Sequence, residues 1–326
     1  MNNNTIIYSP NEIANLAVRY LQERIDNKAY AVDLGHKDLD EIINPAHPGD
    51  LISILGRPGS GKTSFMIRWA RYRAGKLAEM QDAERTVAYI TLEQTVEDLY
   101  AFGLAAETGI TITDMARGNL TAEQMAQIMG VTVKMMNQPL CFLGHSAINR
   151  RARPNLYIDI IRQNLHALED RGNLNGKPFK LDMIFMDYLQ RAPYQGDNKA
   201  IALYDVMNGC KDLALEFACP FALGVQAKRE VEDRKLPVPG LADAQWTSGV
   251  EQISDVVLST VRPSKYREQG QMFGSIMVEG HAQMLVTILK QKLGIDNVFK
   301  WVYLDPALNH LDRLEMKHYK AELDYD

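Results

Sequence analysis

Short runs of consecutive hydrophobic residues alternate along the chain with segments in which hydrophobic residues recur at helical spacing. Continuous apolar runs are typical of strands that are buried on both faces of a parallel sheet. We expect strands at 51–55, 86–92, 140–143, 180–190, 220–226, within 250–261, and at 284–289 and 298–304. We expect helices at 10–24, 64–77, 96–108, 156–168 and 202–217, with two shorter helices between 110 and 138.

This alternation predicts an α/β fold. Strands that alternate with helices build a mainly parallel sheet that is covered by helices on both faces. The last two strands are separated only by a turn region at 293–297, and we expect them to close the fold as a C-terminal antiparallel pair. Ligands in such folds bind beyond the carboxyl ends of the parallel strands, so polar residues at these ends are candidates for a site.

The first expected helix has a clear start and one apolar stripe. Ser9 can cap it, Pro10 suits the first helical position, and Glu12 lies three residues after the cap. The stripe consists of Ile13, Leu16, Ala17, Tyr20 and Leu21. The helix either packs on its own domain or docks on a neighbouring subunit, and its periodicity favours neither arrangement.

The composition is that of an ordinary globular protein. The chain has 326 residues, of which 46% are hydrophobic and 24% are charged, and its net charge is −5. The acidic balance argues against a surface that is basic throughout, but it allows a local basic channel. The chain start lacks the pattern of a secretory signal, and no apolar run approaches the ~18 residues of a membrane span. Cys141, Cys210 and Cys219 lack metal-ligand spacing and suit buried free thiols, so we expect a cytoplasmic protein without a membrane partner.

The strongest chemical signal lies between the strand at 51–55 and the helix that follows it. Residues 56–63 read GRPGSGKT and match the P-loop pattern G-x-x-x-x-G-K-[ST] at every specified position. Glycines let backbone N–H groups turn around phosphate oxygens, Lys62 would neutralise the β- and γ-phosphates, and the Thr63 hydroxyl would ligate Mg²⁺. The predicted phosphate-binding residues are Gly56, Arg57, Pro58, Gly59, Ser60, Gly61, Lys62, Thr63 and Ser64. We therefore predict a site for a nucleoside triphosphate and Mg²⁺.

Polar residues at the ends of three later strands could complete this site. Asp187 follows the apolar run 183–186, as a Walker B acid does, and could hold Mg²⁺ opposite the P-loop hydroxyl. Glu93 follows the strand at 86–92, where a carboxylate could activate the attacking water, although a helix-capping or surface acid is the alternative. Gln226 could sense the γ-phosphate, with a surface amide as its alternative.

A pair of lysines follows the strand at 284–289. Lys290 and Lys292 are two residues apart, so on a strand their side chains point to the same face. They could face a phosphate, which in a ring or filament can belong to the neighbouring subunit. A solvated strand end is the alternative for such a pair.

The order of these motifs resembles the RecA-type ATPases, and within them the motor domain of DnaB-family replicative helicases. Residues 186–190 (MDYLQ) match the V-D-Y-L-Q segment of that family closely, and residues 91–94 (TLEQ) resemble its S-L-E-M strand end. Residues 225–229, 248–252 and 289–292 resemble its S-Q-L-N-R, S-I-E-Q and G-K-Q-R segments. The resemblance covers roughly residues 32–311 and implies a RecA-like P-loop NTPase fold.

The resemblance also implies an assembly and a set of roles. The family forms a ring of six with ATP between subunits and DNA through the centre, so the expected partners are single-stranded DNA and copies of the chain. Residues 1–30 would be a linker-type helix that docks on the adjacent subunit, and residues 31–326 the motor domain. The implied catalytic residues are Lys62, Glu93, Gln226, Lys290 and Lys292, and the implied Mg²⁺ ligands are Thr63 and Asp187.

Three features depart from the family pattern. No primase-binding domain precedes the first helix, so we do not expect coupling to a primase through such a domain. Lys292 stands where the family has an arginine finger, and lysine cannot donate bidentately, although a Lys-x-Lys pair does resemble bacterial RecA. Trp246 lies where the family has an Arg-Glu pair that contacts DNA, so it would stack on a base or simply pack. The expected DNA contacts are then Lys228, Arg229, Arg234, Lys235 and Trp246.

Three functions follow, in this order of preference. The first is an ATP-dependent DNA helicase or translocase of the DnaB type, a hexameric ring on single-stranded DNA with a loader or another replication or recombination protein as partner. The second is a RecA- or RadA-like recombination protein, in which ATP stabilises a filament on DNA. The third is a RecA-fold regulatory ATPase that acts on a protein, which the acidic net charge and Gln245 favour but the segments 188–190 and 251–252 oppose.

Overall fold

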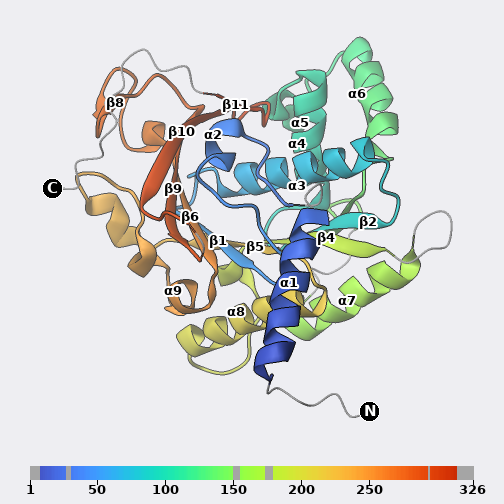
Figure 1. Cartoon of the computed structure of the whole chain (residues 1–326). Helices are drawn as coiled ribbons and strands as arrows, with labels where there is room; N and C mark the ends of the chain where they lie inside the picture. Colours follow the sequence, from blue (N-terminus) through green and yellow to red (C-terminus); the bar gives the residue numbers. More distant parts are fainter. Residues whose placement is uncertain (1–7, 27–30, 150–154, 173–178, 293, 314–326) are drawn as a thin grey trace.

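A nine-stranded sheet runs through the centre of the computed structural model (Figure 1). The structure describes residues 8–26, 31–149, 155–172, 179–292 and 294–313. The strand order is β11-β10-β9-β6-β1-β5-β4-β2-β3, in which β1 to β6 run parallel and β9 to β11 antiparallel. The parallel strands are β1 (Leu51–Gly56), β2 (Arg85–Thr91), β3 (Leu140–Leu143), β4 (Lys180–Asp187), β5 (Phe221–Gln226) and β6 (Val256–Val261). The antiparallel strands are β9 (Gln283–Gln291), β10 (Val298–Leu304) and β11 (Leu311–Arg313).

Helices cover both faces of this sheet, as predicted (Figure 1). One face carries α3 (Lys62–Glu79), α4 (Val96–Thr108), α5 (Ile112–Arg117) and α6 (Ala122–Met135). The other face carries α7 (Ile158–Arg171) and α8 (Lys199–Glu216). The shorter elements are α2 (Lys37–Asp40), α9 (Gly249–Ile253), the 3₁₀ turns η2 (Leu189–Arg191), η3 (Arg229–Asp233), η4 (Leu241–Asp243) and η5 (Pro263–Lys265), and the hairpin β7 (Met272–Phe273) with β8 (Ile276–Met277). The α/β class is therefore confirmed.

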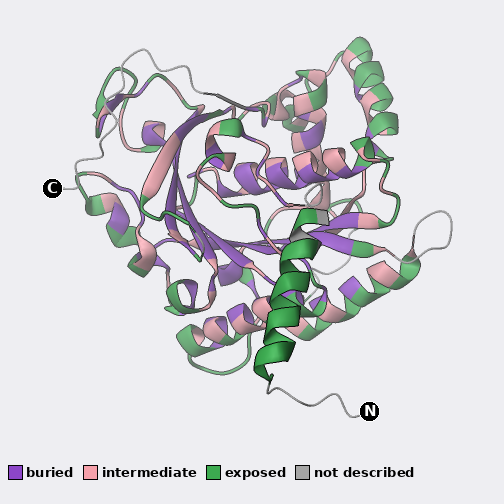
Figure 2. Ribbon diagram, viewed as in Figure 1, coloured by how far each residue is buried: buried purple, intermediate pink, exposed green. Residues whose placement is uncertain are grey.

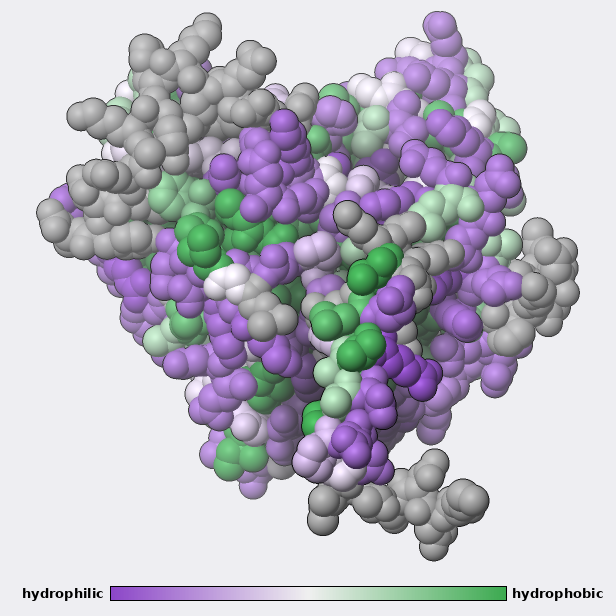
Figure 3. All heavy atoms as spheres, viewed as in Figure 1, coloured by the Kyte–Doolittle hydropathy of each residue, from purple (hydrophilic) through white to green (hydrophobic). Residues whose placement is uncertain are grey.

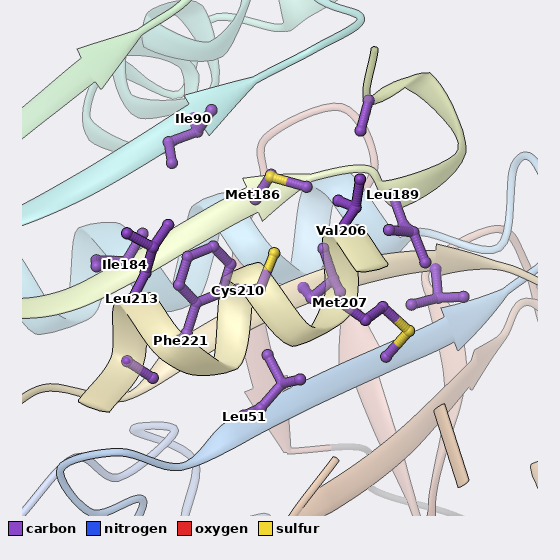
Figure 4. Packing of buried hydrophobic residues seen from close by; sticks show 14 of the residues in the cluster. Leu51, Ile90, Ile184, Met186, Leu189, Val206, Met207, Cys210, Leu213 and Phe221 are labelled. Atoms are coloured by element: carbon purple, nitrogen blue, oxygen red, sulfur yellow. The ribbon is translucent and has the colours of Figure 1, made fainter. Parts of the chain in front are cut away.

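Strand β4 shows why the apolar runs in the sequence are continuous. Met183 and Phe185 belong to the buried cluster on the α3 side, where Phe185 meets Trp69 edge to face at a centroid distance of 5.4 Å. Ile184 and Met186 point the opposite way, into the cluster on the α8 side (Figure 4). Over residues 183–186 both faces of the strand are buried, so no polar residue interrupts this run, and each of its side chains contributes about 1.5–3 kcal/mol of burial.

Helix α1 (Pro10–Asp26) lies on the surface and not in the core (Figure 2). It begins as predicted, because the Ser9 backbone N–H donates to Glu12 Oε2 at 2.7 Å in a capping arrangement. Its apolar side chains are exposed along the helix, for example Leu16 at 43% and Leu21 at 57%, and Figure 3 shows hydrophobic side chains in a row along it. The apolar stripe of α1 is thus not buried on its own domain.

Two details differ from the sequence-based prediction, and a third agrees with it. The strand expected at 180–190 ends at Asp187, because the chain turns there into η2. The C-terminal pair β9 and β10 is present as predicted, but the three-residue strand β11 extends it, and its shortness left no pattern to detect. The two helices expected between 110 and 138 are α5 and α6, and Gly118 ends α5 at a φ of 68°. Residues 1–7, 27–30 and 314–326 of the predicted two-part division lie outside the described residues.

Two further observations concern composition. Cys210 and Cys219 are buried, where burial raises the pKa of both thiols, whereas Cys141 is only partly buried. Within the described ranges, no helix combines the length and hydropathy that a membrane crossing needs.

Candidate active site

The sheet brings the predicted site residues that follow or end four parallel strands, β1, β2, β4 and β5, to the side of the sheet at which the carboxyl ends of these strands lie, called the carboxyl edge below. Pairing of β1 with β5 places Gln226 beside Gly56, the first residue of the P-loop. Pairing of β2 with β4 places Thr91 beside Asp187, and Glu93 follows two residues later. The P-loop, the Walker B acid, the candidate base and the candidate sensor therefore surround the same carboxyl edge, where α/β folds bind ligands.

The P-loop has the backbone shape that its glycines permit. Gly59 and Gly61 have φ angles of 77° and 92°, and a Cβ on Gly61 would collide with the Met284 side chain. Lys62 Nζ donates to the carbonyl oxygens of Gly56 at 2.7 Å and Arg57 at 3.1 Å. Burial lowers the pKa of Lys62 to about 8, although the charge of Asp187 opposes this shift. Lys62 is thus a buried cation that bonds to neutral oxygens of its own loop and is suited to take up a phosphate.

Thr63 and Asp187, the predicted oxygen ligands of Mg²⁺, lie in direct contact. Thr63 Oγ1 donates to Asp187 Oδ2 at 2.6 Å. Asp187 is buried, and this burial raises the pKa of its carboxyl group, although the hydrogen bond from Thr63 acts in the opposite direction. Its Oδ1 atom is also buried and has no hydrogen-bond partner among the described residues. A hydroxyl beside a carboxylate with an unused oxygen fits the ligand preference of Mg²⁺.

The second acid of β4, Asp182, has a different role. It lies at the start of the strand, at the opposite edge of the sheet, and forms a buried ion pair with Arg73 of α3. Arg73 Nη2 donates to Asp182 Oδ1 at 2.9 Å, and both side chains are almost fully buried. Asp182 therefore joins α3 to the sheet and is not part of the nucleotide site.

Glu93 is half-exposed, and its partner is a residue that sequence reasoning missed. Arg191 Nη2 lies 3.4 Å from Glu93 Oε1, and both side chains are about half accessible to solvent. Arg191 ends η2, four residues after Asp187. The closely matched segment stops one residue earlier, at Gln190, so it gave no role to this arginine.

Gln190 connects η2 to the end of β5. Its side-chain Oε1 accepts a hydrogen bond from the backbone N–H of Gln226 at 2.9 Å. Its Nε2 donates to the carbonyl oxygen of Gln245 at 3.1 Å. The backbone of the predicted γ-phosphate sensor is therefore fixed to the segment after the Walker B strand, while the Gln226 side chain stays partly exposed.

A small charge cluster ties the P-loop to the following strand ends. Arg57 donates through Nη1 to the Ala227 carbonyl at 2.9 Å, and its Nε lies 3.1 Å from Glu232. Lys265 donates to the Pro58 carbonyl at 2.6 Å and to Glu232 at 2.8 Å. Hydrogen bonds from Lys265 and Arg57 lower the pKa of Glu232 to about 2. The sequence predicted Arg57 in the loop but gave no signal for Glu232 or Lys265, which meet it only in the fold.

Lys290 and Lys292 are not near the P-loop of their own chain. Strand β9 runs antiparallel to β6, so Lys290 lies beside Val257 at the edge where β1 begins. Lys290 Nζ donates to the carbonyl oxygens of Glu251 and Ser254, both at 2.7 Å. Lys292 is 68% exposed and lies 3.5 Å from Asp255. Lys290 and Lys292 could contact only a phosphate that is bound to a neighbouring subunit, and this role stays a prediction.

The four basic residues predicted to contact DNA divide into two kinds. Lys228 Nζ donates to a backbone carbonyl of the same loop at 2.8 Å. Arg234 makes two hydrogen bonds of 2.7 Å to Asp243, so its charge is largely used inside the loop. Arg229 and Lys235 are exposed. The last two are therefore the better placed for a phosphate backbone, and DNA contact by any of the four stays a prediction.

Trp246 is exposed and is held in an uncommon conformation. Its φ is 59°, and 48% of the residue is accessible. Lys199 Nζ, at the start of α8, lies 3.7 Å from the centre of its ring. The exposed indole and the ammonium group over it suit contact with a nucleobase and its phosphate.

The chain is similar in sequence to replicative DNA helicases. Residues 31–308 match the family model described as the DnaB-like helicase C-terminal domain. A probable plasmid replicative DNA helicase of Chlamydia trachomatis is 30% identical over 231 residues, which cover 70% of this chain and 46% of that protein. Replicative DNA helicase DnaC of Bacillus subtilis is 28% identical over 241 residues, covering 73% and 48%. The chain thus spans about half the length of the curated relatives it matches.

Solved structures support the fold. A separately solved ATPase domain superposes with a TM-score of 0.74 at 18% identity, covering 92% of this chain and 98% of that one. A DnaB-like replicative helicase, described with its interactions with primase, gives a TM-score of 0.72 at 17% identity, covering 92% and 67%. At such identity the likeness concerns the fold, and it agrees with the predicted RecA-like architecture.

Proposed function

Because the chain belongs to the DnaB-like helicase C-terminal domain family, we propose that it is an ATP-driven motor that moves along single-stranded DNA and unwinds duplex DNA in replication. The observation that carries this proposal is the convergence of the P-loop, the Thr63–Asp187 pair and Glu93 at one edge of the sheet. The relatives named as replicative helicases support the same function.

The binding step follows from the P-loop. The phosphates of ATP replace the backbone carbonyls as partners of Lys62, whose burial makes it a strong electrostatic partner for an anion. Backbone N–H groups at the start of α3 and the positive end of that helix hold the same oxygens. Mg²⁺, held by Thr63 and Asp187, would withdraw charge from the phosphates.

Hydrolysis then needs a base and a sensor. Glu93 accepts a proton from the water that attacks the γ-phosphate, and its position after β2 lets it face the nucleotide. Gln226 senses the γ-phosphate from the adjacent strand end. The Gln190 side chain joins the backbone of Gln226 to η2, so a shift at the sensor is transmitted to the loop after the Walker B strand.

Assembly into a hexameric ring completes the site. Lys290 and Lys292 lie at the opposite edge of the sheet from their own P-loop, which suits action on the nucleotide of a neighbour. Lys290 must leave the two carbonyl oxygens that it bonds to here. Lys292 supplies a single positive charge where the arginine of the family would donate bidentately.

Two exposed apolar surfaces support such an assembly. Helix α1 presents the stripe described above, and α6 presents Met125, Met129 and Val133 at intervals of four residues. In the assembly, α1 of one subunit covers α6 of the next, so that both stripes leave water. Residues 1–30 then act as the linker to the neighbouring subunit, and residues 31–326 form the motor.

One experiment tests the function. ATPase rates are measured with and without single-stranded DNA, together with unwinding of a forked duplex, and the Lys62→Ala variant is the control. We expect DNA to stimulate hydrolysis, unwinding to require ATP, and Lys62→Ala to abolish both. Stimulation without unwinding would favour the recombination protein, and no stimulation would favour a regulatory ATPase with a protein partner.

A further inference from the structure

An ion pair links the candidate water-activating residue to the segment after the Walker B strand. Glu93 Oε1 and Arg191 Nη2 are 3.4 Å apart, and each side chain is about half-exposed. The side chains of Tyr188 and then Glu93 raise the pKa of Arg191, so the guanidinium stays charged. The carboxylate that would take a proton from water is therefore engaged by a permanent cation.

Arg191 also lies at a junction between the site and the surface. It is the last residue of η2, whose Gln190 side chain is bonded to both Gln226 and Gln245. The chain runs from η2 through residues 192–198 to Lys199, which covers the exposed ring of Trp246. Burial and then the charge of Arg191 lower the pKa of Lys199, so the two cations lie close enough to interact. The half-exposed guanidinium thus contacts Glu93 on one side and, on the other, lies near the Lys199 cation that covers the Trp246 ring.

The chemistry of the two groups indicates that the Glu93–Arg191 contact slows hydrolysis and that DNA can relieve it. A carboxylate that is held by a neighbouring cation is fixed in one position, so it is less free to align with the attacking water and activates that water less well. A guanidinium prefers a phosphodiester, to which it can donate two parallel hydrogen bonds, over a single contact at 3.4 Å. A DNA phosphate at this loop would therefore compete with Glu93 for Arg191.

We propose that Arg191 is a positioning residue that restrains Glu93 without DNA and releases it when a DNA phosphate binds the guanidinium. Hydrolysis is then slow on the free protein and is switched on by DNA through one ion pair. This inference rests on the proposed ATPase function. It adds the residue by which single-stranded DNA would control the catalytic base.

The test removes the restraint without touching the base. Steady-state ATPase rates at saturating ATP are measured for wild type, Arg191→Gln and Arg191→Lys, each with and without oligo-deoxythymidine. We expect Arg191→Gln to raise the DNA-free kcat about two- to fivefold, the factor that an exposed ion pair of this kind is worth, with KM for ATP unchanged. The ratio of the DNA-stimulated to the DNA-free rate should fall by at least the same factor, and Arg191→Lys should restore part of it.

Two matched variants separate this effect from damage to the fold. Arg162→Gln removes another partly exposed Arg–Glu pair, that of Arg162 with Glu216, and should leave both rates unchanged. Arg191→Gln combined with Glu93→Gln should be inactive, because the gain has to pass through Glu93. A lower or unchanged DNA-free rate in a folded Arg191→Gln protein would overturn the proposal.

The wild-type protein provides a second measurement should Arg191→Gln fail to fold. Salt screens an exposed pair, so the DNA-free kcat at saturating ATP should rise between about 0.05 M and about 0.5 M salt. A flat or falling rate would count against the restraint. A wild-type protein without any ATPase would instead refute the proposed function, so the two failures are distinguishable.

Discussion

The Thr63 hydroxyl donates a hydrogen bond of 2.6 Å to Asp187 Oδ2, across 124 positions of the sequence. The first residue follows the central strand β1, and the second ends β4, two strands away in the sheet. Parallel strands carry both side chains to the carboxyl edge of the sheet, so two separate sequence motifs together supply the ligands that we propose for Mg²⁺.

Replacing Asp187 with Asn should stop catalysis without harming the fold. The change removes the negative charge of the proposed Mg²⁺ ligand, so we expect kcat to fall about 100-fold or more, because metal-ion stabilisation of phosphoryl transfer is worth several kcal/mol. Burial raises the pKa of the Asp187 carboxyl group, so the charge itself is unfavourable here and its loss should not lower the melting temperature. ATPase rates during a Mg²⁺ titration and a thermal melt without nucleotide check both parts.

Asp182→Asn, on the same strand, is the matched contrast. It leaves Arg73 buried without its counter-charge, which costs about 3–5 kcal/mol in comparable cases, so the free energy of unfolding should drop strongly. Denaturant titration measures this loss. Equal stability of the two Asn variants would show that the roles assigned to these acids are wrong.

The pKa of Lys62 predicts a pH dependence of nucleotide binding. In the ligand-free protein this pKa is lowered from 10.5 to about 8, so the ammonium group loses its proton as pH rises through about 8. Bound phosphates favour the charged form, so binding above that pH should be accompanied by proton uptake and a weaker apparent affinity. Calorimetry in buffers of different ionisation enthalpy measures the uptake.

The lowered pKa of Lys62 also determines how the free energy of unfolding changes with pH. Between pH of about 8 and 10.5 the unfolded chain binds more protons at Lys62 than the folded one does, so this group adds stability as pH rises through that window. Lys62→Met should abolish both effects. Proton uptake that persists in Lys62→Met would assign the titration to another group.

Trp246 should contribute to DNA binding by stacking. Trp246→Ala should weaken binding of oligo-deoxythymidine by about 1–3 kcal/mol, the usual size for base stacking on an aromatic side chain. Quenching of tryptophan fluorescence by DNA in wild type, compared with Trp246→Phe, reports the contact directly. Unchanged affinity in Trp246→Ala would mean that the ring only packs against Lys199.

The apolar stripes of α1 and α6 should act as one interface. Leu21→Asp and Met129→Asp each place a charge in a surface that would be buried, so either change should shift the assembly to smaller species. Sedimentation velocity across a concentration series measures this shift. Asn11→Asp, at an exposed polar position of α1, adds the same charge and should leave the assembly intact. An effect of Leu21→Asp without one of Met129→Asp would place the acceptor elsewhere.

Some features could be predicted from the sequence because they depend on local spacing. The P-loop octet, the apolar run before Asp187 and the alternation of strands with helices lie within short segments, and the parallel fold carries their ends to one edge. Other features depend on loops that meet only in three dimensions. The contacts of Glu232 with Arg57 and Lys265, and that of Arg191 with Glu93, join separate segments of the chain, and no local pattern signals them.

Because β9 runs antiparallel to β6, the two ends of the sheet's strands carry different functional residues. Strands β1 to β6 all present their carboxyl ends at the P-loop edge, whereas the antiparallel β9 delivers Lys290 to the other edge. A twofold axis pairs a surface with the same surface of a second subunit, so it cannot bring the P-loop edge of one subunit against the Lys290 edge of another. Contact between them is head-to-tail, and such contacts either close into a ring or continue as a helix. The antiparallel direction of β9 would therefore make all subunits of the assembly face the same way, so that each acts on the nucleotide of the neighbour on one side only.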